Sequence, residues 1–401
     1  MYPVTIKNDI SWIGAVDYNS RDFHGYSLSP LGTSYNAFLL LDEKNVIFDS
    51  VKAEYAGAMI QRLRCAVNPE KIDYLVVNHV EMDHSGALPE LVGLCKPEKI
   101  FCSVMGQKAL EGHFDTAGWP IQAMKSGDSI STGKRTIHFL ETRMLHWPDS
   151  MVSYIPEEKL LISNDAFGQN IASSERFADE ADHAVLAQAV KEYYHNIVQP
   201  YAPQVIKTLD LIGELKLDIR MIAPDHGLIF RNKKDIDFIL RTYRHFAEQP
   251  WKQRALIAYD SMWQSTETMA RYVAEGLVAS GVPCSLFNMK RNHHSAVMTA
   301  LADCGAILVA SPTHNNGMLP AIAGLLAYMK GLRPKNKIGA AFGSFGWSGE
   351  GPQQIHDHLA HMGFAMPLAP VKCRFVPGRD ALDQCFALGE GIAGELIARC
   401  R

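Results

Sequence analysis

The pattern of hydrophobic and polar positions divides the chain into two parts that differ in the order of their predicted strands and helices. Up to about residue 230, paired runs typical of strands, such as SYNAFLLL with NVIFDS and RTIHFLET with MVSYIP and KLLIS, are interleaved with helical stretches. Runs rich in β-branched and aromatic residues predict strands, and spacings of three and four residues predict helices. This part is therefore expected to contain sheets that are covered by helices.

From Arg254 onward the pattern alternates strictly. The apolar runs RALIAY, CSLFNM, AILVAS, KIGAAFGS and VKCRFVP are each followed by a helical stretch. Five short apolar strands that alternate with helices predict a doubly wound parallel sheet. The segment RTYRHFAEQPWKQ, which combines charged residues with a proline, separates the two parts of the chain. We expect an α/β protein with one domain over residues 1–249 and a second over 250–401.

Composition narrows the classes of partner. The 401 residues are 47% hydrophobic and 20% charged, which is enough for two globular cores, and the formal net charge of −4 gives no reason to expect nucleic acid. Neither a secretory leader nor an apolar run near the ~18 residues of a membrane span is present, so we expect no membrane partner and a cytoplasmic location. The eight cysteines never form CxxC, which favours reduced thiols over a disulfide scaffold or an all-cysteine metal site.

The segment VVNHVEMDHSG, residues 76–86, concentrates possible metal ligands after an apolar run. It places His79, Glu81, Asp83 and His84 within six positions. Side chains in a loop at the end of a strand can converge on one point at the mouth of a sheet. For any single pair the alternative is a solvated loop with a capping aspartate. The density of donors favours a metal site.

Three further donors occupy equivalent positions downstream. His146 in MLHWPDS, Asp165 in KLLISNDAFG and His226 in IAPDHG each follow an apolar run. Taken alone, His146 is explained as a half-buried histidine, Asp165 as a helix cap and His226 as a turn residue. Together with the first four they predict one shared site at an edge of the folded sheets.

The donor set restricts the metal. Four imidazoles and three carboxylates without a thiolate disfavour copper(I) and structural zinc, and suit iron, manganese or a two-zinc hydrolytic site. Seven donors exceed one tetrahedral site, whereas two metals with a shared carboxylate would use them all. Asp165, the solitary carboxylate midway along the set, is the candidate bridge.

The pattern His79-x-Glu81-x-Asp83-His84, with the three downstream donors, resembles the flavodiiron proteins, or A-type flavoproteins. This resemblance implies a metallo-β-lactamase-like αββα sandwich followed by a flavodoxin-like domain. Zinc hydrolases of the same fold typically carry HxHxDH, so Glu81 supplies an anionic ligand that shifts the preference toward iron. By resemblance, one iron is held by His79, Glu81 and His146, the other by Asp83, His84 and His226, and Asp165 bridges them. Whether His84 binds iron directly or stands behind a ligand is left open.

Three predicted strand ends of the second domain carry small, polar and aromatic residues, where a flavodoxin-like sheet seats FMN. The loop DSMWQST offers hydroxyls and backbone N–H groups to a phosphate at a helix start, although such residues are also ordinary helix caps. The loops SPTHN and SFGW follow the third and fourth strands, and their aromatics have ordinary loop packing as the alternative. The expected FMN-binding residues are Ser261, Met262, Trp263, Ser265, Thr266, Ser311, Pro312, Thr313, His314, Asn315, Ser344, Phe345, Gly346 and Trp347.

The resemblance implies an oxidoreductase that reduces dioxygen to water or nitric oxide to nitrous oxide at a two-iron centre fed by FMN. It further implies a head-to-tail homodimer, with Trp147 as an edge residue between the cofactors, and a separate rubredoxin-like donor, since no rubredoxin-type CxxC pairs are present. His24, Tyr26 and Tyr194 are candidates for hydrogen bonds to a metal-bound oxygen, although Tyr194 also suits a plain core position. No residue decides between dioxygen and nitric oxide.

Two alternatives come from other functional classes. A binuclear zinc hydrolase with an accessory flavodoxin-like domain would use the same histidines, but Glu81 and the FMN-like loops argue against it. An electron carrier that uses FMN alone would leave seven metal donors without a role. The reductase is therefore the preferred hypothesis.

Overall fold

The computed structural model describes residues 1–401, which form two compact units. Unit 1 consists of Met1–Gly25, Ser29–Tyr194 and Tyr201–Ala247, and unit 2 consists of Tyr26–Leu28, His195–Pro200 and Glu248–Arg401. Each unit is described by itself below. The assignment of function to residues 1–249 and 250–401 stays a prediction.

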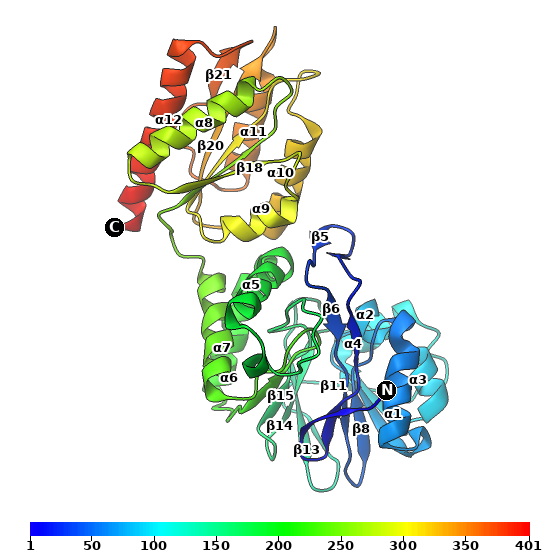
Figure 1. The fold of residues 1–401 in the computed structure, drawn as a ribbon. Coiled ribbons are helices and arrows are strands. Elements are labelled where there is room, and N and C mark those ends of the chain that lie inside the picture. The colour runs from blue at the N-terminus through cyan, green and yellow to red at the C-terminus, as the bar shows by residue number, and fades with distance from the viewer. The chain divides into compact units, whose positions relative to one another are not determined.

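Unit 1 is built on two sheets (Figure 1). The seven-stranded sheet has the order β1 (Val4–Lys7), β2 (Ile10–Trp12), β7 (Phe38–Leu40), β8 (Asn45–Phe48), β9 (Ile72–Val77), β10 (Lys99–Ser103) and β11 (Ile121–Met124). The five-stranded sheet has the order β12 (Ser129–Ser131), β13 (Thr136–Glu141), β14 (Met151–Ile155), β15 (Leu160–Ile162) and β16 (Met221–Ala223). Two small ribbons pair β3 (Ala15–Asp17) with β6 (Thr33–Tyr35) and β4 (Asp22–Phe23) with β5 (Ser27–Leu28).

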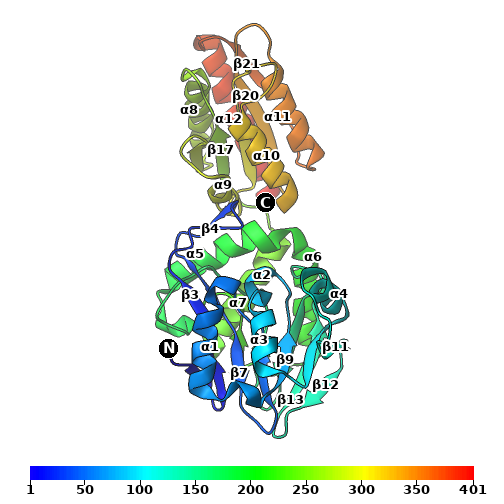
Figure 2. The ribbon, with the colours of Figure 1, turned by 90° about the vertical axis from the view of Figure 1, so that its right-hand side faces the viewer.

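The two sheets pack face to face, and helices cover their outer faces (Figures 1 and 2). Phe38 and Phe48 of the first sheet meet Phe139 and Ile162 of the second in one buried cluster. The helices of unit 1 are α1 (Ala56–Ala66), α2 (Met82–Ser85), α3 (Leu88–Cys95), α4 (Val104–His113), α5 (His183–Tyr193), α6 (Ala202–Glu214) and α7 (Lys233–Glu248). Alternating side chains line the inner faces because successive residues of a strand point to opposite sides. The αββα sandwich is confirmed.

The helices follow from their apolar spacing. Helix α7 buries Ile236, Ile239 and Tyr243, at spacings of three and four residues, and leaves charged side chains on its other face. Helix α5 begins after Asp182, whose carboxylate accepts hydrogen bonds from the N–H groups of Ala184 and Val185. Short 3-10 segments cover Ala53–Tyr55, Pro69–Lys71, Ala178–Glu180 and Gln199–Tyr201, and a π-helical turn covers Tyr194–Val198.

Unit 2 contains a parallel five-stranded sheet in the order β18 (Cys284–Asn288), β17 (Ala255–Tyr259), β19 (Ala306–Ala310), β20 (Ile338–Phe345) and β21 (Val371–Arg374). Its helices are α8 (Ser265–Ala279), α9 (His294–Leu301), α10 (Pro320–Leu332), α11 (Glu350–His361) and α12 (Arg379–Cys400). The order places the second strand outside the first, as in flavodoxin-like sheets. Every residue of β17 and β19 is buried, because helices cover both faces. The predicted doubly wound parallel sheet is confirmed.

Helices α8 and α12 lie against each other on one face of this sheet (Figure 1). A Cβ atom added at Gly276 would lie 2.1 Å from the carbonyl oxygen of Phe386, and one added at Gly389 would lie 2.2 Å from that of Val273. These two glycines therefore let the helix backbones touch, and alanine at either position would force the helices apart.

Candidate functional site

The structure brings all seven predicted metal donors together in unit 1. Their loops follow β9, β13, β15 and β16, which belong to both sheets, so the site lies where strand ends of the two sheets meet. Each of the seven side chains is at least nine-tenths buried. The donor atoms form two groups, and Asp165 is shared between them.

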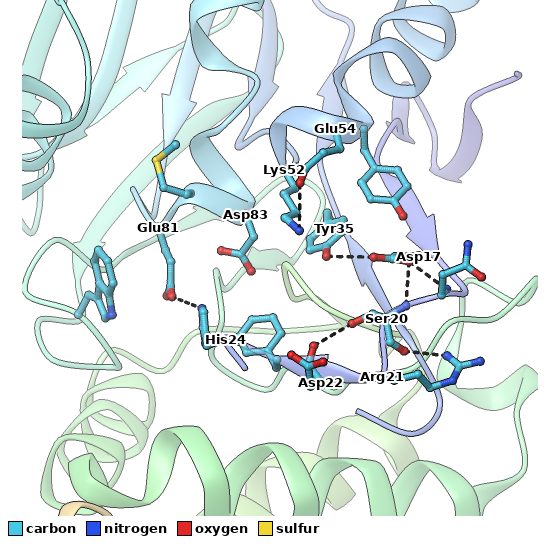
Figure 3. Close-up of a pocket in the computed structure, with 15 residues that line it drawn as sticks. Asp17, Ser20, Arg21, Asp22, His24, Tyr35, Lys52, Glu54, Glu81 and Asp83 are labelled. Carbon is cyan, nitrogen blue, oxygen red and sulfur yellow. Dashed lines mark hydrogen bonds and ion pairs between the residues drawn. The ribbon is translucent and has the colours of Figure 1, made fainter. Parts of the chain in front are cut away.

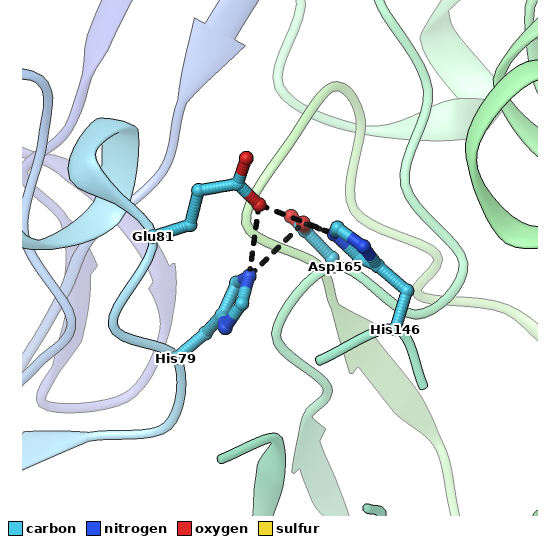
Figure 4. A group of neighbouring side chains, drawn as sticks. All are labelled: His79, Glu81, His146 and Asp165. Carbon is cyan, nitrogen blue, oxygen red and sulfur yellow. Dashed lines mark hydrogen bonds and ion pairs between the residues drawn. The ribbon is translucent and has the colours of Figure 1, made fainter. Parts of the chain in front are cut away.

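The first group consists of His79, Glu81, His146 and Asp165 (Figure 4). The Nε2 atom of His79 lies 3.2 Å from Glu81 Oε2 and 3.6 Å from Asp165 Oδ2. The Nε2 atom of His146 lies 3.3 Å from the same Glu81 oxygen and 2.8 Å from the same Asp165 oxygen. Four donor atoms from four side chains thus face one small volume.

The second group consists of Asp83, His84 and His226, with Asp165 beside it. The Nε2 atoms of His84 and His226 lie 3.1 Å apart, and each lies within 3.4 Å of Asp83 Oδ2. Asp165 Oδ1 lies 3.0 Å from the His84 nitrogen and 3.4 Å from the His226 nitrogen. His84 therefore points into the cluster with Nε2.

The carboxylate of Asp165 lies between the two groups. Its Oδ2 atom faces His79 and His146, whereas its Oδ1 atom faces His84 and His226. One carboxylate with an oxygen toward each donor group is the arrangement that a shared ligand of two cations requires.

Polar groups behind the histidines fix their rings. His79 Nδ1 lies 3.0 Å from Asp149 Oδ2, and His226 Nδ1 donates to the carbonyl oxygen of Ser34 at 2.6 Å. A hydrogen bond at Nδ1 leaves Nε2 as the atom that binds a metal. Asp149 was not among the predicted site residues, although it stands three positions after His146 in the same loop. The fully buried Asp225 was also missed, and its Oδ2 lies 3.8 Å from His84 Nδ1.

The cluster carries excess negative charge. Burial opposes ionisation of Asp83, but the neighbouring His84 and His226 outweigh burial and lower its pKa. Burial likewise opposes the charged form of His84, but Asp83 and Asp165 raise its pKa to about 10. Asp83 and Asp165 therefore hold a proton on His84 unless other positive charge is present. Two metal cations would supply that charge, so the donor set fits a two-metal centre.

A cavity of about 660 Å³ connects this cluster with the surface of unit 1 (Figure 3). Glu81, Asp83 and Trp147 are among the residues that line it. His24 lies in the same cavity, and its Nε2 is 2.7 Å from Glu81 Oε1. Burial opposes the charged form of His24, but the hydrogen bond to Glu81 and the nearby carboxylates raise its pKa.

The two predicted tyrosines are placed elsewhere. Tyr194 is buried against the rings of Tyr243 and Phe246, and Tyr26 is half exposed with its ring against Tyr328. The tyrosine near the cluster is Tyr193, whose ring lies 5.8 Å from that of His226 and whose buried hydroxyl has no hydrogen-bond partner. The pair of tyrosines at 193 and 194 was recognisable in the sequence. Neighbouring side chains of a helix point about 100° apart, so the sequence did not show which of the two tyrosines faces the cluster. Catalytic roles for Tyr26 and Tyr194 stay predictions.

A second cavity, of about 510 Å³, lies in unit 2 at the carboxyl ends of four parallel strands. Eleven of the predicted FMN-binding residues line it: Ser261, Met262, Trp263, Ser265, Pro312, Thr313, His314, Ser344, Phe345, Gly346 and Trp347. Phe375 and Val376 also line it and were not predicted. They follow β21, and the rule that ligands bind at the carboxyl ends of parallel strands points to that loop as well.

Four other predicted cofactor residues do not line this cavity. Thr266 stands behind it and shares a hydrogen bond of 3.0 Å with Ser344 Oγ. Ser311 accepts a hydrogen bond from the N–H of Leu319 at 2.8 Å, and Asn315 lies in an exposed turn. Trp147 belongs to the cavity of unit 1.

Comparison with known proteins supports the division of the chain into a β-lactamase-like part and a flavodoxin-like part. Residues 33–227 match the family model described as ODP family beta lactamase, and residues 257–389 match the Flavodoxin model. The chain is 52% identical to a rubredoxin-oxygen oxidoreductase of Megalodesulfovibrio gigas over 100% of this chain and 99% of the relative. It is 42% identical to a nitric oxide reductase of Moorella thermoacetica over 98% and 99%.

A solved structure decides the family. The flavodiiron protein from Giardia intestinalis superimposes with a TM-score of 0.95 and 31% identity, over 100% of this chain and 98% of that one. This chain belongs to the flavodiiron protein family. The predicted family and fold are confirmed, and the flavodiiron chain carries both parts in the expected order. No helix of this flavodiiron chain combines the length and the apolar character that a membrane crossing requires.

Proposed function

We propose that this flavodiiron protein is an oxidoreductase that reduces dioxygen to water, nitric oxide to nitrous oxide, or both. FMN held by unit 2 would supply the electrons, and a two-iron centre held by unit 1 would bind the gas. The observation that carries the proposal is the carboxylate of Asp165, which offers one oxygen to each of two buried donor groups. The relatives named for these two activities support the proposal.

The iron ligands are assigned from the two groups. One iron would be held by His79, Glu81 and His146, and the other by Asp83, His84 and His226, with Asp165 shared. When bound, the irons would supply a site for a diatomic molecule and FMN would supply electrons singly or in pairs. The carboxylate of Glu81 in place of a neutral imidazole favours iron over zinc, so the hydrolase alternative is not favoured.

The protein groups around the centre orient ligands and deliver protons. Asp149 holds His79 with Nε2 toward the centre, and the carbonyl of Ser34 does the same for His226. His24, on Glu81, is placed to donate a proton at its Nε2, and the hydroxyl of Tyr193 is placed to donate a hydrogen bond beside His226. The surrounding side chains are buried, which strengthens these interactions.

The finer assembly is also proposed. We infer a head-to-tail homodimer in which one chain's FMN serves its partner's irons, and a separate rubredoxin-like donor in the cytoplasm. Two features support the dimer. Trp263 and Trp347 at the flavin cavity are 89% and 86% exposed, and the cavity of unit 1 far exceeds the size of a diatomic molecule.

A mixture of two inactive variants tests the dimer. One chain carries Asp165→Ala and keeps its flavin, and the other carries Thr313→Glu, which places a charge in the flavin cavity. If flavin and iron pair between chains, mixed dimers regain gas consumption. If the pair forms within one chain, no mixture regains it, and sedimentation shows whether mixed dimers were present.

The reaction itself is tested with the protein loaded with iron and FMN. The reduced protein is supplied anaerobically with one donor, and its steady consumption of dioxygen is compared with that of nitric oxide. Consumption of either gas supports the proposal, and the ratio of the two rates assigns the substrate. A colourless protein that binds zinc, lacks flavin and consumes neither gas would favour the hydrolase.

A further inference from the structure

The wall of the unit 1 cavity contains a carboxylate and two tyrosines that the proposed roles above do not use. Asp17, Tyr35 and Tyr55 line this cavity together with Asp83 of the metal cluster. Asp17 is 8% exposed and Tyr35 is 3% exposed. A buried carboxylate that is not among the candidate metal ligands needs an explanation, because burying a charge is costly.

Asp17 connects the two tyrosines. Its Oδ2 accepts a hydrogen bond from the hydroxyl of Tyr35 at 3.4 Å, and Tyr55 also bonds to its side chain. Its Oδ1 accepts from the N–H groups of Asn19 and Ser20, each at 3.0 Å. The pairing of β3 with β6, in which Ala15 lies opposite Tyr35, holds the carboxylate and the hydroxyl on neighbouring strands.

Tyr35 also faces the metal cluster. In the view of Figure 3 it lies between Asp17 and Asp83, and its ring is 5.9 Å from that of His226. Asp83 Oδ1 is buried and has no hydrogen-bond partner. Tyr35 therefore stands between Asp17 and a carboxylate of the candidate metal centre in the wall of one cavity.

We propose that Asp17 and the Tyr35 hydroxyl form a proton entry route to the Asp83 side of the metal centre. The proposal rests on the reductase function. Each dioxygen reduced to two waters takes up four electrons and four protons, and each pair of nitric oxide molecules reduced to nitrous oxide and water takes up two of each. The electrons come from the donor through FMN, and the protons come from solvent through Asp17.

The chemistry of the three groups suits this role. A hydroxyl can accept a proton on its oxygen while it donates its own, and a carboxylate has two oxygens that can accept hydrogen bonds. Burial, assisted by Asp17, raises the pKa of Tyr55 to about 12, and burial with Asp17 and Asp83 raises that of Tyr35 further. Both hydroxyls therefore keep their protons at neutral pH. His24 on Glu81 is a separate donor on the other side of the centre.

Two variants test the route in the full chain loaded with iron and FMN. Asp17→Asn keeps the acceptor oxygen for the Asn19 and Ser20 N–H groups, and Tyr35→Phe keeps the ring against His226. Either variant should slow gas consumption by about tenfold or more, since a positioned proton donor contributes roughly 10²–10⁴-fold. A pH indicator in stopped flow should show equally slowed proton uptake, with a larger solvent deuterium isotope effect.

Rescue separates a relay from a structural role. A small tertiary ammonium buffer at constant pH should restore proton uptake in Asp17→Asn as its concentration rises, and Asp17→Glu should restore it without buffer. Ser20→Ala is the matched control, because its hydroxyl faces Asp22 and Ser29 and not Asp17. It should behave as wild type in both measurements.

Iron content and flavin content of every variant show whether the site is intact. Unchanged proton uptake in both iron-loaded variants overturns the route, and so does a loss that neither buffer nor Asp17→Glu restores. Proton uptake during anaerobic chemical reduction is measured without any gas. If wild type consumes neither gas the reductase function fails, whereas slowed uptake on reduction in the variants still supports the route.

Discussion

The metal cluster of unit 1 and the flavin cavity of unit 2 differ in the chemistry and the burial of the side chains that would bind a cofactor. The cluster consists of seven charged or titratable side chains, all buried, whose donor atoms lie within a few ångströms of one another. The flavin cavity is lined by small, hydroxyl and aromatic residues, and two of its tryptophans are almost fully exposed. A cation needs converging charge, whereas a flavin needs surface, backbone donors and space.

The difference also concerns stability. Buried carboxylates and imidazoles oppose folding unless they are paired. Bound metal would therefore offset the free-energy cost of burying the cluster. The flavin cavity carries no comparable free-energy cost of buried charge, because the strands and helices around it pack in apolar clusters of their own. Loss of metal should therefore disturb unit 1 more than loss of flavin disturbs unit 2.

The largest effect is expected for Asp165→Ala. This change removes the carboxylate that faces both donor groups, so that Asp83 alone remains as an anion beside His84 and His226. We expect gas consumption to fall by about 100-fold or more, with fewer than two irons per chain and unchanged FMN content. Metal analysis and flavin absorbance measure the two cofactors separately. Normal iron content in this variant would show that the shared carboxylate is dispensable.

These two sites were not equally predictable from the sequence. The metal donors were recognisable because four of them lie within six positions, and the structure places all seven in one cluster. Phe375 and Val376 were missed because only three strand ends were assigned to the flavin, although β21 ends at the same edge of the sheet. Asp149 and Tyr193 were missed because a supporting role depends on side-chain direction, which spacing alone does not give. The strands of both domains were predictable from their apolar runs.

A second prediction concerns the buried charge of unit 2, where Lys337 is 5% exposed. Burial lowers its pKa from 10.5 to about 8 in the folded chain. Between these values the unfolded chain binds more protons, so this lysine makes folding more favourable as pH rises. Relative to Lys337→Met, wild type should gain up to about 3 kcal/mol of unfolding free energy from pH 8 to 10.5.

Urea unfolding of unit 2 at several pH values measures this difference. Lys335→Met is the matched control, because it removes an exposed lysine of the same loop and leaves the buried Lys337 in place. An equal pH dependence in wild type and Lys337→Met would show that the buried amine keeps an ordinary pKa.

The third prediction concerns which metal the cluster prefers. Glu81→His replaces an anionic ligand with a neutral one and removes the partner of His24. Because softer nitrogen ligands suit zinc, the zinc-to-iron ratio after loading from an equal mixture should rise about tenfold. Metal analysis measures the ratio, and Glu54→His, at an exposed position of the same cavity, is the control. An unchanged ratio would mean that Glu81 does not set the preference.

The smallest effect is expected at the rim of the flavin cavity. Trp347→Ala removes an exposed indole from the cavity wall but leaves the hydroxyls and backbone donors in place. Aromatic contacts contribute about 0.5–1.5 kcal/mol, so FMN should bind about two- to tenfold more weakly, with unchanged iron content. Flavin fluorescence titration measures the affinity, and Trp251→Phe, outside the cavity, is the control. A complete loss of FMN would mean that a single side chain holds the flavin, as Asp165 is expected to hold the metals. A small loss would mean that many weak contacts share the task, which is why no single residue of this pocket was conspicuous in the sequence.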